Sequence, residues 1–195
     1  MAYLWAMRIP GRTVLAACTL ALAVSMLAGC TSSHPSADPT NSPKPTPTPV
    51  FTSDADALAA GTEVYKSYMK ASDDIAHDGG ANPERVKPFV SESGYQHELD
   101  AADTYKTEHS HGIGYAVLNN AILQSHHEKN GIATVTLYTC QDISGVDRVD
   151  QGGKSLTQAN RDDFIAYEPV LRSDKTGHLV LQSNPYWSGG GICKF

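Results

Sequence analysis

Histidines are the side chains of this sequence whose spacing comes nearest to that of metal ligands. His109 and His111 stand two positions apart, and two imidazoles so spaced on a strand share one face and can chelate a metal. However, these two fall in a turn between a helix and a strand, and His126 and His127 fall at the end of a hairpin. The sequence has no His-Glu-x-x-His pattern and no carboxylate at a recognisable partner spacing. We interpret these residues and His97 as exposed histidines, with metal binding as the alternative.

Two further patterns fail as catalytic motifs. The segment Gly152-Gly153-Lys154-Ser155 ends like a phosphate-binding loop, but that loop needs a glycine at position 148, where this chain has Arg148. A Gly-x-Ser-x-Gly nucleophile elbow is also absent. The sequence therefore predicts no catalytic residue and no cofactor.

Cys140 and Cys193 are the cysteines expected to lie in the folded part of the chain. In an exported protein two such cysteines most often form a disulfide. The bridge would close a loop of about fifty residues and stabilise the fold by about 4 kcal/mol in the chain-entropy account. A metal pair or a reactive thiol is the alternative, and neither has the usual close Cys-x-x-Cys spacing.

The first thirty residues have the composition of a targeting segment. Arg8 and Arg12 provide positive charge, and residues 14–27 form an apolar run that is shorter than the roughly 20 residues needed to span a bilayer. The run ends in Leu27-Ala28-Gly29-Cys30, which resembles the lipobox of bacterial lipoproteins. The resemblance implies cleavage before Cys30, loss of Cys18 with the signal, and a diacylglyceryl thioether on the Cys30 thiol. An ordinary signal peptide with an incidental cysteine and an uncleaved anchor helix are the alternatives.

Residues 31–53 are nearly all Ser, Thr and Pro up to position 49. Such a segment lacks the apolar side chains needed to offset its ordering entropy. Its alternating prolines favour polyproline II, at about 3.1 Å per residue, so it would reach roughly 60 Å. We therefore divide the chain into a signal peptide (1–29), a lipidated cysteine with a stalk (30–53) and a folded domain (54–195).

The charge balance limits the partners of the mature chain. The whole sequence has 15 Lys and Arg against 21 Asp and Glu, and loss of Arg8 and Arg12 leaves 13 against 21, a net charge near −8. No basic run or stripe remains, which argues against nucleic acid and against peripheral binding to anionic lipid. The expected partners are the lipid bilayer, through the lipid on Cys30, and an unidentified envelope protein or small ligand.

The domain begins with helical patterns and continues with strand patterns. Ser53 and Asp56 form a capping box at the start of a helix that runs to position 77. Asn82 and Pro83 are expected to cap a short second helix, and residues 93–108 predict a third. Period-two alternation predicts four strands, with Asn130-Gly131 as the hairpin turn between the first two and a polar connection over 146–160. The four strands are 113–126, 132–143, 163–171 and 178–183.

This order of elements resembles the NTF2-like (cystatin-like) α+β fold over about residues 54–187. The resemblance implies a cone in which a long N-terminal helix and two shorter helices pack on a curved antiparallel sheet of about four strands. Proteins with this fold include isomerases, dehydratases and non-catalytic modules on bacterial surface proteins, so the fold does not determine the function.

A cavity at the open end of such a cone would suit tyrosines, because their rings pack while their hydroxyls reach polar ligand atoms. Asp163 near the start of a strand could act as a base there, although packed core tyrosines are the preferred interpretation. Tyr105 and Tyr186 belong to the same aromatic group. The candidate lining residues are Tyr95, Tyr115, Tyr138, Asp163, Tyr167 and Trp187.

Together these features predict a lipid-anchored lipoprotein on the outer face of the bacterial cytoplasmic membrane. Its domain is expected to be a non-enzymatic binding or interaction module. A small-ligand carrier and an envelope enzyme of NTF2-like type are the alternatives.

Overall fold

The computed structural model describes residues 48–194. The expected signal peptide, Cys30 and most of the stalk lie outside this range. The described residues form an α+β domain with three helices and seven strands. In chain order these are α1 (Asp54–His77), η1 (Pro83–Phe89), α2 (Glu92–Thr107), β1 (Ser110–Ile113), β2 (Val117–Lys129), β3 (Ile132–Asp142), β4 (Asp147–Asp150), β5 (Phe164–Tyr167), β6 (Val170–Ser173) and β7 (Leu179–Ser183). The α+β class is confirmed, whereas the expectation of about four strands was too low.

Helix α1 begins where its capping signal predicts. The hydroxyl oxygen of Ser53 accepts a hydrogen bond from the backbone N–H of Asp56 at 3.1 Å, which satisfies one of the unpaired donors of the first turn. Gly61 brings this helix close to the sheet, since a Cβ there would lie 3.2 Å from Val135 and 3.4 Å from Leu137. The helix therefore packs across the inner face of β3.

The two shorter helices differ in how they begin. Asn82 precedes the 3-10 helix η1 in the left-handed conformation, at φ 52°, and makes no side-chain cap, so the expected cap is wrong. Helix α2 is capped by Ser91, whose hydroxyl accepts from the N–H of Gly94 at 3.2 Å. Ala102 is the fully buried residue of α2 and packs beside Gly80, which follows α1. The turn that follows α1 is therefore in direct contact with α2.

Strand β3 is the centre of the antiparallel sheet. β2 pairs with it along one edge, and β6 and β5 share the other edge, at residues 134–136 and 139–142 respectively. The single strand expected over 163–171 is thus two strands, interrupted at Glu168 and Pro169. Proline lacks the N–H that a ladder position requires, while its carbonyl oxygen still accepts from the N–H of Leu137 at 3.0 Å.

A second, two-stranded sheet arises where the sequence predicted one long strand and a polar loop. Gly114 has φ 76°, and a Cβ there would lie 1.9 Å from the carbonyl oxygen of Gly145. The chain turns at this contact, so β1 leaves the line of β2 and pairs with β4, His111 opposite Val149. The expected strand 113–126 is therefore wrong in its first residues, and the connection 146–160 contains a strand.

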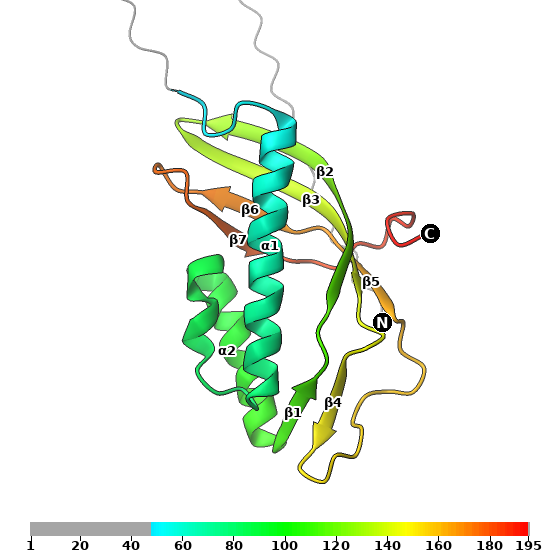
Figure 1. Ribbon diagram of the computed structural model, residues 1–195. Coiled ribbons are helices and arrows are strands. Elements are labelled where there is room, and N and C mark those ends of the chain that lie inside the picture. The colour runs from blue at the N-terminus through cyan, green and yellow to red at the C-terminus, as the bar shows by residue number, and fades with distance from the viewer. Residues whose placement is uncertain (1–47, 195) are drawn as a thin grey trace, which may run out of the picture. The chain divides into compact units, whose positions relative to one another are not determined.

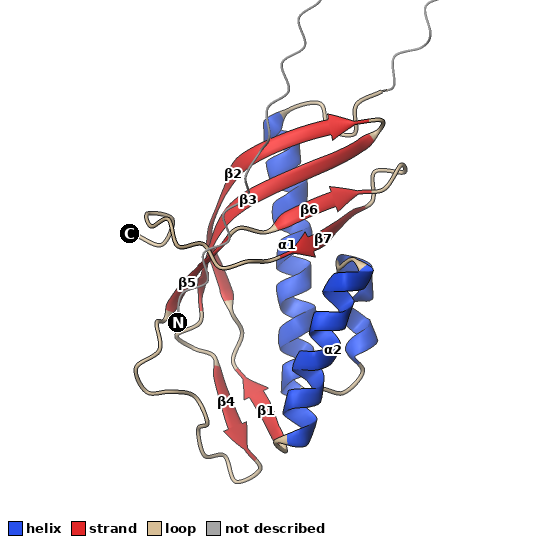
Figure 2. Ribbon diagram, turned by 180° about the vertical axis from the view of Figure 1, so that it is seen from behind, coloured by secondary structure: helices blue, strands red, loops and turns tan. Residues whose placement is uncertain are grey.

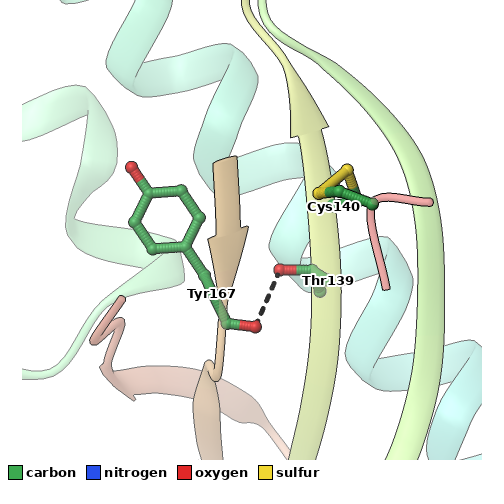
Figure 3. Close-up of a disulfide and its surroundings, with 4 residues drawn as sticks. Thr139, Cys140 and Tyr167 are labelled. Carbon is green, nitrogen blue, oxygen red and sulfur yellow. Dashed lines mark hydrogen bonds between the residues drawn. A yellow bond between two sulfur atoms is a disulfide. The ribbon is translucent and has the colours of Figure 1, made fainter. Parts of the chain in front are cut away.

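The helices cover one face of the sheet and the C-terminal tail lies at the other (Figure 1; Figure 2). Tyr65, Val135, Leu137 and Leu171 are fully buried between the layers. On the opposite face of β3, Cys140 forms a disulfide with Cys193, with the two Cα atoms 5.2 Å apart (Figure 3). This is the pairing expected from the sequence, and it fixes the tail to the sheet.

The packed part of the chain begins slightly before the predicted boundary at residue 54. The N–H of Val50 donates to Oε2 of Glu128 at 2.9 Å, and the ring of Phe51 meets the imidazole of His126 edge-on, with centroids 5.6 Å apart. The last residues assigned to the stalk therefore contact β2. None of the helices between residues 48 and 194 is long and apolar enough to cross a membrane.

Candidate functional site

A cavity of about 500 Å³ lies between α1, α2 and the C-terminal strands. We call it the tyrosine cavity. Its walls come from segments far apart in the sequence, which the packing of α2 against β7 brings together. The lining residues are Tyr68, Val90, Gly94, His97, Glu98, Tyr167, Leu181, Gln182, Ser183, Asn184, Pro185 and Tyr186.

Glu98 is held in this cavity by two hydroxyl groups of α1. Tyr68 donates to Oε1 and Ser72 donates to Oε2, each at 3.0 Å. Tyr68 and Ser72 are four residues apart and so lie on one face of the helix. Burial raises the pKa of Tyr68, and the neighbouring carboxylate of Glu98 raises it further. The phenol therefore stays protonated and remains a donor to Glu98.

A second network joins the cavity wall to the core. Tyr65 donates its hydroxyl to Oδ1 of Asn184 at 3.0 Å and accepts from Nε2 of Gln141 at 2.8 Å. Tyr65 is fully buried and Gln141 is 8% exposed, so each polar group needs the other. Burial raises the pKa of Tyr65. Asn184 is thereby fixed at the cavity wall by groups that no ligand would touch.

Two stacked tyrosines belong to the same wall. The rings of Tyr167 and Tyr186 lie 5.0 Å apart between centroids, with 25° between their planes. Burial raises the pKa of Tyr167, and Tyr186 raises it further. The tail holds Tyr186 in place through hydrogen bonds from Glu168 N–H to the Pro185 carbonyl and from Trp187 N–H to the Ala166 carbonyl, both at 2.9 Å. Thr139 on β3 donates weakly, at 3.5 Å, to the carbonyl of Tyr167, next to the disulfide (Figure 3).

Of the candidate lining residues inferred from the sequence, Tyr167 lies in this cavity. Tyr95 packs against the core instead, with the Lys87 ammonium 4.5 Å from its ring centroid. Tyr115 lies in a separate hollow near the end of α1, where its hydroxyl donates to Oδ1 of Asp74 at 3.0 Å. The aromatic set does not form a single site.

The other candidates lie farther from the cavity. The rings of Tyr138 and Trp187 are in tilted contact, with centroids 4.4 Å apart, and Tyr138 alternates with the buried Leu137 and Thr139 on β3. Their contact is therefore on the face of the sheet that carries the disulfide. Asp163 is exposed, and its carbonyl accepts from the N–H of Ile143 at 2.8 Å. The carboxylate in the cavity is that of Glu98, not Asp163.

Sequence reasoning missed Tyr68, Glu98 and Asn184 as site residues. A partial signal exists, because Tyr65, Tyr68 and Ser72 place three hydroxyl groups within two turns of one helix. Their partners Glu98 and Asn184 lie 30 and 119 residues away along the chain, and only the tertiary fold brings them together.

The histidines are distributed as separate side chains. His109 is exposed in the turn after α2 at φ 48°, and His111 lies in β1. The prediction of an exposed His126 is wrong, because its side chain is 13% exposed and its Nδ1 lies 3.4 Å from Oδ1 of Asp54. His97 lines the tyrosine cavity. Between residues 48 and 194 no three His, Cys, Asp or Glu side chains are grouped so as to hold a metal ion.

No protein-family model and no curated protein matches this chain. Among solved structures, the intermembrane space region of the chloroplast protein ARC6 is similar at a TM-score of 0.49 and 10% identity, covering 66% of this chain and 95% of that one. A de novo designed β-sheet protein is similar at a TM-score of 0.31 and 11% identity, covering 72% of this chain and 95% of that one.

Proposed function

We propose that this chain is a bacterial lipoprotein whose folded domain binds a small ligand in the tyrosine cavity without catalysing a reaction. In this proposal the lipid on Cys30 anchors it to the outer face of the cytoplasmic membrane. The positive, apolar and lipobox segments before Cys30 support the anchor. Two acyl chains would make that attachment stable, whereas a single chain holds only marginally.

We also propose that the domain is an NTF2-like cone. Helix α1 lies across the sheet, as the long helix of that fold does, and β2 has register shifts between Leu118 and Asn120 and between Leu123 and Ser125. Such bulges bend a strand and increase its twist. A bent sheet with helices on its inner side leaves room for a cavity at one end.

The cavity is the observation that carries the ligand-binding proposal. Its volume of about 500 Å³ falls within the roughly 300–1,000 Å³ typical of small-molecule sites. Apolar walls from Val90, Leu181 and Pro185 alternate with a few polar groups held by other parts of the fold. A site built this way is formed before the ligand arrives, which lowers the entropy cost of binding.

Binding is favoured over catalysis because of how Glu98 is held. Both of its oxygens already accept a hydrogen bond, from Tyr68 and Ser72. The carboxylate is thus fixed in position at the cavity wall, which suits it to orient a ligand. The other carboxylate candidate, Asp163, is exposed.

The binding proposal is tested by filling the cavity. Ser183 lines it at the end of β7 and is exposed, so Ser183→Trp should occupy the space without disturbing the core. We expect the purified chain to bind members of a small-molecule fragment set, as detected by saturation-transfer NMR. The Ser183→Trp variant should no longer bind these fragments. Gln124→Trp, on the exposed side of β2, is the control and should bind normally. Equal binding by wild type and Ser183→Trp would place the ligand elsewhere.

The anchor is tested by metabolic labelling with a fatty-acid analogue. Cys30→Ser should abolish the label, because Cys30 is the cysteine that follows the lipobox residues Leu27, Ala28 and Gly29. Cys18→Ser should keep it, because that residue would leave with the signal peptide. Label that persists on the Cys30→Ser chain would contradict the lipoprotein proposal.

A further inference from the structure

The charge of the tyrosine cavity is one-sided. Among the described residues that line it, Glu98 carries the one formal charge when His97 is counted as neutral, and none is Lys or Arg. The mature chain is acidic overall, which adds a weak field of the same sign. An anionic ligand would meet the Glu98 carboxylate without a compensating cation, whereas a cation would be attracted.

Glu98 retains the capacity to bind such a ligand. A carboxylate has about four lone-pair sites, and Tyr68 and Ser72 use one site on each oxygen. Both donors come from α1, so they hold the carboxylate from one side and leave its cavity side available. The raised pKa of Tyr68 keeps its hydroxyl protonated, so it remains a neutral donor to Glu98.

The aromatic side chains supply the second feature that cation recognition requires. Tyr68, Tyr167 and Tyr186 line the cavity together, and Tyr186 is 76% exposed even though its ring stacks on Tyr167. The faces of aromatic rings attract ammonium groups, and aromatic side chains recognise quaternary ammonium ligands in this way. An exposed ring held in place by the tail is available to contact a ligand.

We infer that the tyrosine cavity binds a small organic cation, with its nitrogen at the Glu98 carboxylate and its apolar substituents against Tyr167 and Tyr186. The inference rests on the proposal that this cavity is a ligand site, and it adds the chemical class of the ligand. A primary amine would donate hydrogen bonds to Glu98, and a quaternary ammonium would rely on charge and ring contact.

Four probe molecules of similar size and different charge test the chemical class of the ligand. Phenethylamine and benzyltrimethylammonium are cations, 2-phenylethanol is neutral and 3-phenylpropanoate is an anion. Each would be titrated into the isotope-labelled full chain while the backbone amide shifts of the cavity residues are followed. We expect the cations to bind at least tenfold more tightly than the alcohol, and the anion to bind most weakly.

Two pairs of variants measure how much Glu98 and Tyr186 each contribute to cation binding. Glu98→Gln should weaken the binding of the cations at least tenfold and leave the binding of 2-phenylethanol unchanged. Glu92 is exposed on the same helix, and Glu92→Gln should change neither affinity. Tyr186→Leu should weaken the binding of the cations, whereas Tyr186→Phe, which keeps the ring, should not. Because Tyr186 is so exposed, neither change should affect folding.

The outcomes separate the two proposals. Preferential binding of the cations that depends on Glu98 supports the inference. Equal or tighter binding of the alcohol or the anion at the cavity amides would overturn the cation class and leave the ligand site standing. If none of the four probes shifts a cavity amide at millimolar concentration, the cation inference is overturned, and loss of fragment binding in Ser183→Trp remains the separate test of the site.

Discussion

The hydroxyl of Tyr68 lies 3.0 Å from Oε1 of Glu98, and this hydrogen bond joins the middle of α1 to α2. Ser72, one turn later on α1, reaches the other oxygen of the same carboxylate. Glu98 thus links the two helices and is also the charged group of the tyrosine cavity. A ligand at Glu98 would therefore act on the contact between the helices, and changes in helix packing would act on the ligand.

The hydroxyl network of Tyr65 should contribute measurably to stability. Tyr65→Phe leaves Gln141 and Asn184 without their shared partner, and a buried group that loses its partner costs about 1–3 kcal/mol. We expect the free energy of unfolding in urea to fall by about 1–2 kcal/mol. Tyr138→Phe keeps its ring contact with Trp187 and should change the value by less than about 0.5 kcal/mol. Equal effects of the two substitutions would contradict this account.

Three glycines separate steric clash from backbone strain. A Cβ on Gly80, at φ 81°, would lie 2.1 Å from the carbonyl oxygen of Ala102, whereas Gly131, at φ 72°, has nothing within 4 Å. Gly190 has open space and no positive φ. We expect Gly80→Ala to destabilise most, by roughly 3 kcal/mol or more, and Gly131→Ala by about 1–2 kcal/mol. Gly190→Ala should be neutral, and thermal unfolding of all three tests the order.

Local signals in the sequence predicted the elements that depend on neighbouring residues. Ser53 caps α1, and Asn130 and Gly131 adopt positive φ angles of 57° and 72° in the turn between β2 and β3. The stability of the helix cap and of the hairpin turn each depends on only a few adjacent residues. The pairing of β1 with β4 could not be read in this way, because it depends on the close approach of Gly114 and Gly145 across the fold.

The candidate site was predicted less well because its residues meet through tertiary packing. Period-two alternation in β3 places Tyr138 on the face opposite Leu137, which in principle separates Tyr138 from an inner cavity. The sequence does not show which helical carboxylate faces Tyr68, since that depends on the rotation of α2 against α1. Glu98 became recognisable only through its hydrogen bonds.

Asp73 and Asp74 should have opposite effects on the pH dependence of stability. Burial raises the pKa of Asp73 above 3.8, so the folded state binds more protons and stability falls as pH rises through the window above 3.8. Hydrogen bonds from Lys70 and then Tyr115 lower the pKa of Asp74. Its contribution is present above 3.8 and is lost as pH falls through the folded-state pKa.

The substitutions that test this are Asp73→Asn and Asp74→Asn, measured by urea unfolding between about pH 3 and pH 7. Asn at position 73 keeps an oxygen for the N–H of Ala116, which the carboxylate accepts at 2.9 Å. Relative to wild type, Asp73→Asn should gain stability as pH rises. Asp74→Asn should be less stable at pH 7 and approach wild type in acid. Parallel shifts of the two variants would show that the burial of Asp73 has no energetic effect.

Reduction of the Cys140–Cys193 bridge should lower stability while leaving the fold intact. The bridge links residues 53 positions apart, and a loop of that length corresponds to about 4 kcal/mol in the chain-entropy account, or a fall in Tm of roughly 10 °C. Circular dichroism should stay unchanged below the transition, because the helices and hairpins have their own buried faces.

In a chain cleaved before Cys30, Trp187 is the one tryptophan, and its contact with Tyr138 at 4.4 Å makes its fluorescence a direct report on the tail. We expect the Trp187 emission to shift to the red when the disulfide of the wild type is reduced. The emission of the double variant Cys140→Ala, Cys193→Ala should not respond to reductant. If a thiol assay shows complete reduction while Tm and the Trp187 emission stay constant, then packing of the tail holds it to the sheet and the disulfide does not.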